Sequence, residues 1–94
     1  MRVITKRRIE EFIKRFAASR PSLVNWYVIT RRATWRNLAE LKADFSSADQ
    51  VGRRTIFNIS GNKYRLIARV NYEGQRVFVL HILTHKEYDD VAWN

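Results

Sequence analysis

Two pairs of side chains in the second half of the chain have the chemistry to act on a phosphate. Arg65 and Arg69 are four residues apart, and His85 and Tyr88 are three residues apart. Arginine presents a fixed fork of N–H donors that fits a phosphate, and it always carries its positive charge. Histidine exchanges protons near neutral pH, and a tyrosine hydroxyl beside cations can also do so. Together these residue types could stabilise a charged phosphate and move protons around it.

His85 and Tyr88 follow a pattern that is typical of a helix start. Thr84 and Glu87 have the spacing of a capping box, which predicts a helical turn and puts His85 and Tyr88 on one side of it. A helix start at the edge of a basic sheet is a natural anion site. The same pattern has a purely structural interpretation, in which Tyr88 covers the edge of the core and His85 is exposed. A metal site is disfavoured, because two histidines without His-x-x-x-His spacing and no cysteine make a poor zinc ligand set.

Alternating apolar residues predict three strands that would position the arginines. The strands span residues 53–59, 64–72 and 76–83, with turns at residues 61–62 and 73–75. Arg65 and Arg69 then share one strand face, about 13 Å apart at about 3.3 Å per residue. If the second turn pairs even positions with even ones, His81 lies across from Arg65 or Ile67 on the same face. The alternative without a function is that Arg65 and Arg69 are solvated or paired with nearby acidic residues.

The opposite face of this sheet is predicted to be apolar and to pack against helices. Its residues would be Tyr64, Leu66, Val70, Phe78, Leu80 and Ile82. The helices come from the first half, where an apolar stripe at helical spacing runs through Ile9, Phe12, Ile13 and Phe16. Thr5 could cap this first helix, Pro21 ends it and opens a second, and Asn37 and Glu40 predict a short third one. Residues 1–4 read as a short edge strand. We therefore predict an α+β domain, with helices on one face of a small antiparallel sheet.

The positive charge is concentrated at the N-terminal end. The 94 residues carry a net charge of +9, and the first 36 hold ten basic and two acidic residues, or +8. Such a run could bind RNA or an acidic partner, or could be a solvated face. Its helical members are Lys6, Arg7, Arg8, Lys14, Arg15, Arg31 and Arg32. The tryptophans Trp26, Trp35 and Trp93 read as core residues rather than as platforms for bases.

Length and composition exclude several classes of protein. The chain is short enough for one domain only, residues 1–94, because two cores would need more residues. Without cysteine there is no disulfide scaffold and no thiol catalysis. No apolar run reaches the roughly 18 residues of a membrane span, and no apolar segment follows the basic start as in a signal peptide. We therefore expect a cytoplasmic protein with a polyanionic or acidic partner.

Two segments, Asn58 to Leu66 and Thr84 to Asp89, resemble the HigB family of type II toxin–antitoxin toxins, which are small RelE-like mRNA interferases. The resemblance implies a RelE-like fold and metal-independent cleavage of mRNA in the ribosomal A site, without a cofactor. It also implies a HigA-type antitoxin with a helix-turn-helix domain. Only the antitoxin would bind operator DNA, and the toxin would not contact it.

Under this resemblance, the mechanism is attack of a ribose hydroxyl on the adjacent phosphate. Arg65 would stabilise the charge, and His85 and Tyr88 would take the two proton roles. The RNA contacts would come from Asn62, Lys63, Arg69 and His81. Asp89 could join the catalytic set, or could balance charge at the helix start.

Two other functions fit the same charge: a non-catalytic module that binds RNA, and a basic structural protein of the ribosome. An RNA-recognition sheet needs exposed aromatic residues on its central strands. Here Tyr64, Tyr72 and Phe78 are all predicted on the side packed against the helices. This placement favours the cleaving toxin over the binding module.

Overall fold

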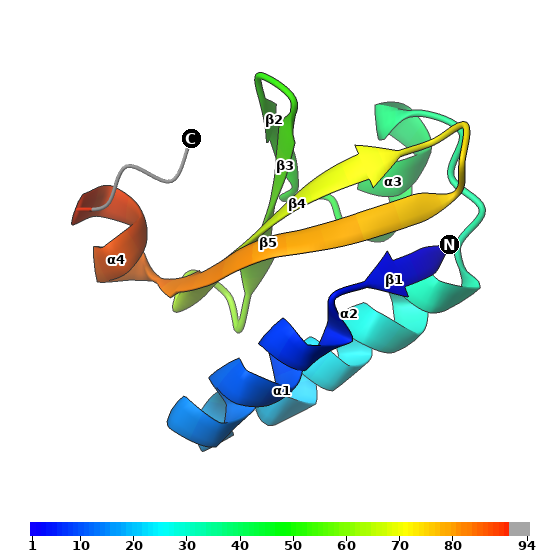
Figure 1. The fold of residues 1–94 in the computed structure, drawn as a ribbon. Helices are drawn as coiled ribbons and strands as arrows, with labels where there is room; N and C mark the ends of the chain where they lie inside the picture. Colours follow the sequence, from blue (N-terminus) through cyan, green and yellow to red (C-terminus); the bar gives the residue numbers. More distant parts are fainter. Residues whose placement is uncertain (91–94) are drawn as a thin grey trace.

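The chain folds into a five-stranded sheet with helices packed against it (Figure 1). The computed structural model describes residues 1–90. In chain order, the elements are β1 (Arg2–Ile4), α1 (Lys6–Arg15), the 3-10 turn η1 (Ala17–Ser19), α2 (Arg20–Arg32), α3 (Leu38–Asp44), β2 (Asp49–Val51), β3 (Arg54–Ile59), β4 (Tyr64–Asn71), β5 (Arg76–Thr84) and α4 (His85–Asp90). The predicted α+β class is confirmed. Within residues 1–90, no helix is both long and apolar enough to cross a membrane.

The sheet has the strand order β1-β5-β4-β3-β2 and is mixed rather than antiparallel. The edge strand predicted at the start of the chain exists, but β1 runs parallel to β5. The other three pairings are antiparallel. Strand β2 was not predicted, because it is three exposed residues long and has no apolar alternation. A two-residue turn at Gly52 and Arg53 joins β2 to β3, and its first residue has φ +60°, a conformation that favours glycine.

Helices α1 and α2 lie side by side and cover one face of the sheet (Figure 1). The predicted stripe is buried at Ile9, Phe12 and Ile13. Trp26 of α2 is 1% exposed and meets Phe57 of β3 edge to face, with ring centroids 5.3 Å apart. Such burial contributes about 1.5–3 kcal/mol per large apolar side chain. The prediction that Trp26 and Trp35 are core residues is confirmed, and Trp93 lies outside the described residues.

The helix ends differ in part from their predicted positions. Thr5 does not cap α1 with its side chain, because its backbone is left-handed, with φ 72°. Helix α1 already ends at Arg15, and η1 turns the chain before Pro21 enters the first turn of α2. Asn37 does cap α3, since its Oδ1 accepts from the backbone N–H of Glu40.

The predicted pairing of β4 with β5 is right at one end and wrong at the other. The loop between β4 and β5 holds four residues instead of the predicted three. Near this loop, odd-numbered residues of one strand therefore pair with even-numbered residues of the other, as Arg69 does with Phe78. A bulge at Leu80 then restores the predicted register, and His81 pairs with Ile67. Val77 and Val79 therefore join the core, and Phe78 and Leu80 lie on the opposite face with Arg69.

We call the face of the sheet turned away from α1 and α2 the far face. By register it carries Arg54, Ile56, Asn58, Arg65, Ile67, Arg69, Phe78, Leu80, His81 and Leu83. The predicted absence of aromatic residues from this face is wrong, because Phe78 is there. The shared face of Arg65 and Arg69 is confirmed, since β4 itself is regular between them.

Candidate active site

Arg65 and Tyr88 meet on the far face, although they are distant in the sequence. The guanidinium carbon of Arg65 is 5.1 Å from the centre of the Tyr88 ring. Arg65 is half-buried on β4, and Tyr88 is half-buried on α4, which follows β5 directly. A cation over an aromatic ring is attracted by the ring's negative face, which fixes both side chains. The structure thus brings together a predicted charge stabiliser and a predicted proton-transfer group.

Two amide side chains orient the guanidinium group of Arg65. Its Nη1 donates to Oδ1 of Asn58 and, at 3.3 Å, to Oδ1 of Asn62. Asn58 is the cross-strand partner of Arg65 in the β3–β4 register, so the sheet itself sets this contact. Both acceptors are neutral, and Arg65 makes no ion pair with another residue of the described part of the chain. Its positive charge is therefore oriented but not neutralised by a carboxylate.

The pair lines an open hollow of 200 Å³ between β2, β3, β4 and α4. The lining residues are Ser47, Asp49, Val51, Ile56, Asn58, Arg65 and Tyr88. This space is small and largely polar, which suits a single phosphate group with its sugar rather than a bulky apolar ligand. We refer to it as the Arg65 hollow.

The position of Tyr88 depends on a reciprocal cap at the start of α4. The backbone N–H of Thr84 donates to Oε1 of Glu87 at 2.9 Å, and that of Glu87 donates to Oγ1 of Thr84 at 3.1 Å. The predicted capping box is therefore confirmed. A further hydrogen bond, from the backbone N–H of His85 to the carbonyl oxygen of Lys63, ties α4 to the β3–β4 turn. On the other side, Nη2 of Arg15 lies 3.8 Å from Oε2 of Glu87, which links α1 to α4.

Replacing Thr84 with alanine should loosen α4 without unfolding the domain. Loss of a helix cap costs about 1 kcal/mol, or about fivefold in the local opening equilibrium. Hydrogen–deuterium exchange should show faster exchange of the amides after residue 86, with unchanged protection of β4. Thr84→Ser keeps the hydroxyl and is the matched control. Equal protection of α4 in both variants would show that the cap does not hold this helix.

His85 lies outside the Arg65 hollow, although it is on the same helix as Tyr88. Its imidazole is exposed, and Nε2 is 3.2 Å from Oδ2 of Asp89, one helical turn later. The carboxylate orients the ring and leaves its other nitrogen free of this ion pair. The sequence analysis placed His85 and Tyr88 on one side of the turn, and only Tyr88 lines the hollow.

The predicted RNA contacts fall into separate places. Asn62 touches Arg65, and Lys63 is exposed beside it in the β3–β4 turn. Arg69 lies further along β4, in another hollow with Arg53, Arg54 and Leu80. His81 belongs to the far face by register, but it is exposed at the free edge of β5 and there lines a third hollow together with Arg8, Phe12 and Arg15 of α1. Desolvation by partial burial lowers the pKa of His81, and the charges of Arg8 and Arg54 lower it further.

Three polar residues that line the Arg65 hollow were absent from the predicted site. Asn58 was part of the motif but had no assigned role, and only the strand register identifies it as a partner of Arg65. Ser47 lies in the turn before β2, and Asp49 is the first residue of β2, a strand that the alternation of apolar residues does not predict. Asp49 brings a carboxylate to the hollow, so a second proton acceptor is available there.

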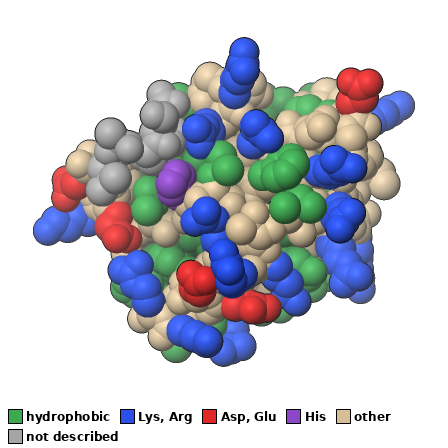
Figure 2. Space-filling view, viewed as in Figure 1, with side chains coloured by type: hydrophobic (Ala, Val, Ile, Leu, Met, Phe, Trp, Pro, Cys, Tyr) green, Lys and Arg blue, Asp and Glu red, His purple; other side chains and the backbone are tan. Residues whose placement is uncertain are grey.

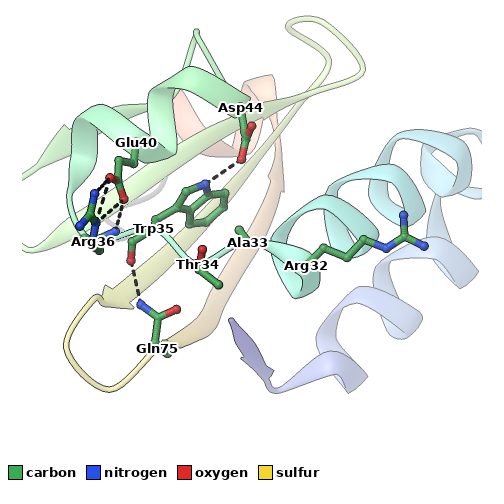
Figure 3. A pocket seen from close by; sticks show the side chains of 8 residues that line it. All are labelled: Arg32, Ala33, Thr34, Trp35, Arg36, Glu40, Asp44 and Gln75. Atoms are coloured by element: carbon green, nitrogen blue, oxygen red, sulfur yellow. Dashed lines mark hydrogen bonds and ion pairs between the residues drawn. The ribbon is translucent and has the colours of Figure 1, made fainter.

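A wider hollow of 720 Å³ lies elsewhere and has a structural explanation (Figure 3). It is lined by Arg32, Ala33, Thr34, Trp35, Arg36, Glu40, Asp44 and Gln75. Its polar groups bind one another: Nη2 of Arg36 is 2.8 Å from Oε2 of Glu40, and the indole N–H of Trp35 donates to Asp44. Gln75 donates to the carbonyl oxygen of Trp35, which joins the β4–β5 loop to the segment before α3. None of the predicted site residues lines it.

The basic residues of α1 are partly paired within the helix. Lys6 lies 3.9 Å from Glu10, and Arg7 lies 3.4 Å from Glu11, each one turn apart. Surface pairs of this kind contribute only about 0.3–0.5 kcal/mol, so they do not remove the surplus charge. Figure 2 shows blue basic side chains spread widely over this view, with fewer red acidic ones. Within residues 1–90, no cluster of three or more His, Asp or Glu side chains could hold a metal ion.

Comparison with known proteins gives one consistent answer. The model of the HigB_toxin family, described as the RelE-like toxic component of a toxin–antitoxin system, matches residues 19–91. The mRNA interferase toxin HigB of Escherichia coli K12 is 28% identical over 92 residues, which cover 95% of this chain and 88% of that protein. The mRNA interferase HigB of Escherichia coli O6:H1 is 28% identical over 95 residues, which cover 98% and 92%. The range that the family model matches includes every residue lining the Arg65 hollow.

Proposed function

Because the chain belongs to the HigB family of RelE-like toxins, we propose that it is the toxin of a toxin–antitoxin system and inhibits translation by cleaving mRNA. Similar proteins carry the name mRNA interferase. The observation that supports this activity best is the Arg65 hollow. It combines an oriented guanidinium group, which has no carboxylate partner among the described residues, with an adjacent phenol ring.

RNA supplies its own nucleophile for this reaction. The ribose 2′-oxygen attacks the neighbouring phosphorus and loses its proton, and the bond from phosphorus to the 5′-oxygen breaks. The 5′-oxygen then takes up a proton, which leaves a 2′,3′-cyclic phosphate and a 5′-hydroxyl. The phosphorane between these states carries extra negative charge. We assign the stabilisation of this charge to Arg65, whose fork can bond two phosphate oxygens at once.

The two proton transfers need groups on opposite sides of the phosphorus. We assign them to Tyr88 and His85: one of the two takes the proton from the 2′-oxygen, and the other gives a proton to the 5′-oxygen. Tyr88 lines the hollow, and its ring lies against the Arg65 guanidinium group. His85 is oriented by Asp89 and would reach the substrate from the rim of α4. Asp49, in the wall of the hollow, is a further proton acceptor in this proposal.

The partners follow from the family and from the charge. A toxin of this family has an antitoxin, which we propose to be a HigA-type protein with a helix-turn-helix domain. The substrate is mRNA in the ribosomal A site, in the cytoplasm. The exposed basic residues of α1 and α2 provide charge for contacts with ribosomal RNA; they are Lys6, Arg7, Arg8, Lys14, Arg15, Arg31 and Arg32. Asn62, Lys63, Arg69 and His81 are the proposed contacts with the mRNA strand.

Controlled expression in a bacterium tests the function. The wild-type chain should stop growth, and mapping of mRNA 5′ ends should show new ends within coding sequences soon after induction. Co-expression of the antitoxin should restore growth. Arrested growth with intact messages would instead support a non-catalytic module that binds RNA or the ribosome.

Cleavage should continue after metal removal, because the proposed mechanism uses only the 2′-hydroxyl and protein groups. We expect the purified protein, dialysed against EDTA, to cleave a free RNA at an unchanged rate in an assay that contains EDTA. The upstream fragment should end in a 2′,3′-cyclic phosphate, which mass spectrometry identifies. A rate that falls with EDTA and returns with Mg²⁺, together with 3′-hydroxyl ends, would contradict this mechanism.

A further inference from the structure

The far face carries a second basic hollow that the proposed chemistry does not use. Arg53, Arg54 and Arg69 line a space of 380 Å³ together with the half-buried Leu80. No acidic side chain lines it. Within the part of the chain that the structure describes, none of the three arginines forms an ion pair.

Two of these charges come from neighbouring positions of β3 and β4 and line the same hollow. The paired residues of β3 and β4 end at Thr55 and Ala68, so Arg54 and Arg69 occupy the next position, on the far face. Like charges directly opposite each other destabilise a sheet. The turn after Gly52 adds the third charge at Arg53. Three like charges therefore gather without an acidic partner among the described residues, an arrangement that costs folding free energy and is typical of a functional site.

An aromatic ring lies beside these charges. The guanidinium carbon of Arg69 is 4.9 Å from the centre of the Phe78 ring. The bulge in β5 leaves Leu80 on the same face, so an apolar surface borders the cations. Surfaces that bind single-stranded RNA combine cations for the phosphates with flat groups on which bases stack.

The second hollow is aligned with the Arg65 hollow along one strand. Arg65 and Arg69 are four residues apart on the same face of β4, or about 13 Å, and the buried Ile67 lies between them. One RNA strand lying along β4 would meet both. We propose that Arg53, Arg54 and Arg69 form a second phosphate-binding site that holds the substrate strand a few nucleotides away from the cleaved bond. This inference rests on the proposed function and extends it.

The test compares RNAs of two lengths on the purified toxin. Fluorescence anisotropy would measure the binding of 2′-O-methyl RNAs, which are not cleaved, of about two nucleotides, too short to reach both hollows, and of about twelve nucleotides. In the variant with Arg53, Arg54 and Arg69 all changed to Gln, affinity for the longer RNA should fall about tenfold or more. The slope of log affinity against log salt should become shallower by about 2. Affinity for the shorter RNA should change less than about twofold.

Two control variants make the result specific. A variant with Arg2, Lys42 and Arg76 changed to Gln loses the same charge from exposed positions of β1, α3 and β5. It should lose little affinity, and equally for both RNAs. Changing the three hollow arginines to lysine should keep the salt slope, since lysine still neutralises phosphate as a point charge.

Equal losses for both RNAs in the glutamine variant would overturn the proposal, because they would report net charge only. Unchanged affinity for the longer RNA would also overturn the proposal. If the variant with unchanged RNA affinity also fails to bind the antitoxin, the hollow binds an acidic protein instead of RNA. If the wild-type protein cleaves mRNA while the glutamine variant binds the longer RNA normally, this inference fails and the proposed function stands. Failure of the wild-type protein to bind or cleave RNA would overturn both.

Discussion

Replacing Arg65 with glutamine should slow mRNA cleavage by about 10²- to 10³-fold, the usual cost of removing one preorganised donor that stabilises charge in the transition state. Glutamine keeps a hydrogen-bond donor of similar length but removes the positive charge. The effect should appear in the single-turnover rate at saturating RNA, with a much smaller change in affinity. Arg65→Lys keeps the charge and loses the fork of donors, so its cleavage rate should lie between those of the wild-type protein and Arg65→Gln.

The matched control for this prediction is Arg76→Gln. Arg76 is exposed at the start of β5 and lines neither the Arg65 hollow nor the second hollow, so the variant loses the same charge elsewhere. It should cleave at close to the wild-type rate. If Arg65→Gln and Arg76→Gln have equal rates, Arg65 does not stabilise the transition state, even if the protein remains an mRNA-cleaving toxin.

Tyr88→Phe should reduce the cleavage rate by about 10²- to 10⁴-fold, the range expected for loss of a group that transfers a proton in the transition state. The substitution removes only the hydroxyl. Phenylalanine keeps the ring on which the Arg65 guanidinium rests, so binding of RNA and the folding of α4 should be preserved. Single-turnover kinetics, with the RNA dissociation constant measured separately, would separate the chemical step from binding.

His85 provides the comparison for the other proton. His85→Gln should also lower the single-turnover rate, and Asp89→Asn should lower it less, because Asp89 acts only by orienting the imidazole. If His85→Gln leaves the rate unchanged while Tyr88→Phe abolishes it, the second proton role belongs to another group. Asp49 would then be the next residue to replace, since it lines the hollow.

The sequence predicted elements well where periodicity and caps act locally. The stripe of α1, the three long strands and the Thr84–Glu87 cap are all encoded within a few neighbouring residues, and all are present. The short strand β2 was missed because its three residues are exposed and form a strand only by pairing with β3. The parallel pairing of β1 with β5 was also missed, because it joins the two ends of the chain.

The register of β4 with β5 shows why local patterns are not sufficient. Alternation identified both strands, but the four-residue loop and the bulge at Leu80 decide which side chains share a face. A shift of one residue moves every side chain to the opposite face. This is why Phe78 was predicted in the core and lies beside Arg69 instead.

The candidate site was predicted by residue type better than by geometry. Arg65 was predicted on a strand, and Tyr88 was predicted in a helical turn that starts with a capping box at the end of β5. Both residues are near each other in the structure. Asn58 and Asp49 could not, because they reach the hollow only through strand pairing. The family identified from the motifs is confirmed by the family model, and the roles of the individual residues remain predictions.

The most direct test of the account is a crystal structure of the protein with an RNA that carries a 2′-deoxyribose at the cleavage position, so that the nucleophile is missing. We predict that the scissile phosphate lies in the Arg65 hollow, with an oxygen within hydrogen-bond distance of the Arg65 guanidinium group and near the Tyr88 hydroxyl. A scissile phosphate bound at any other surface, with the Arg65 hollow free of RNA, would contradict the assignment of this hollow as the active site.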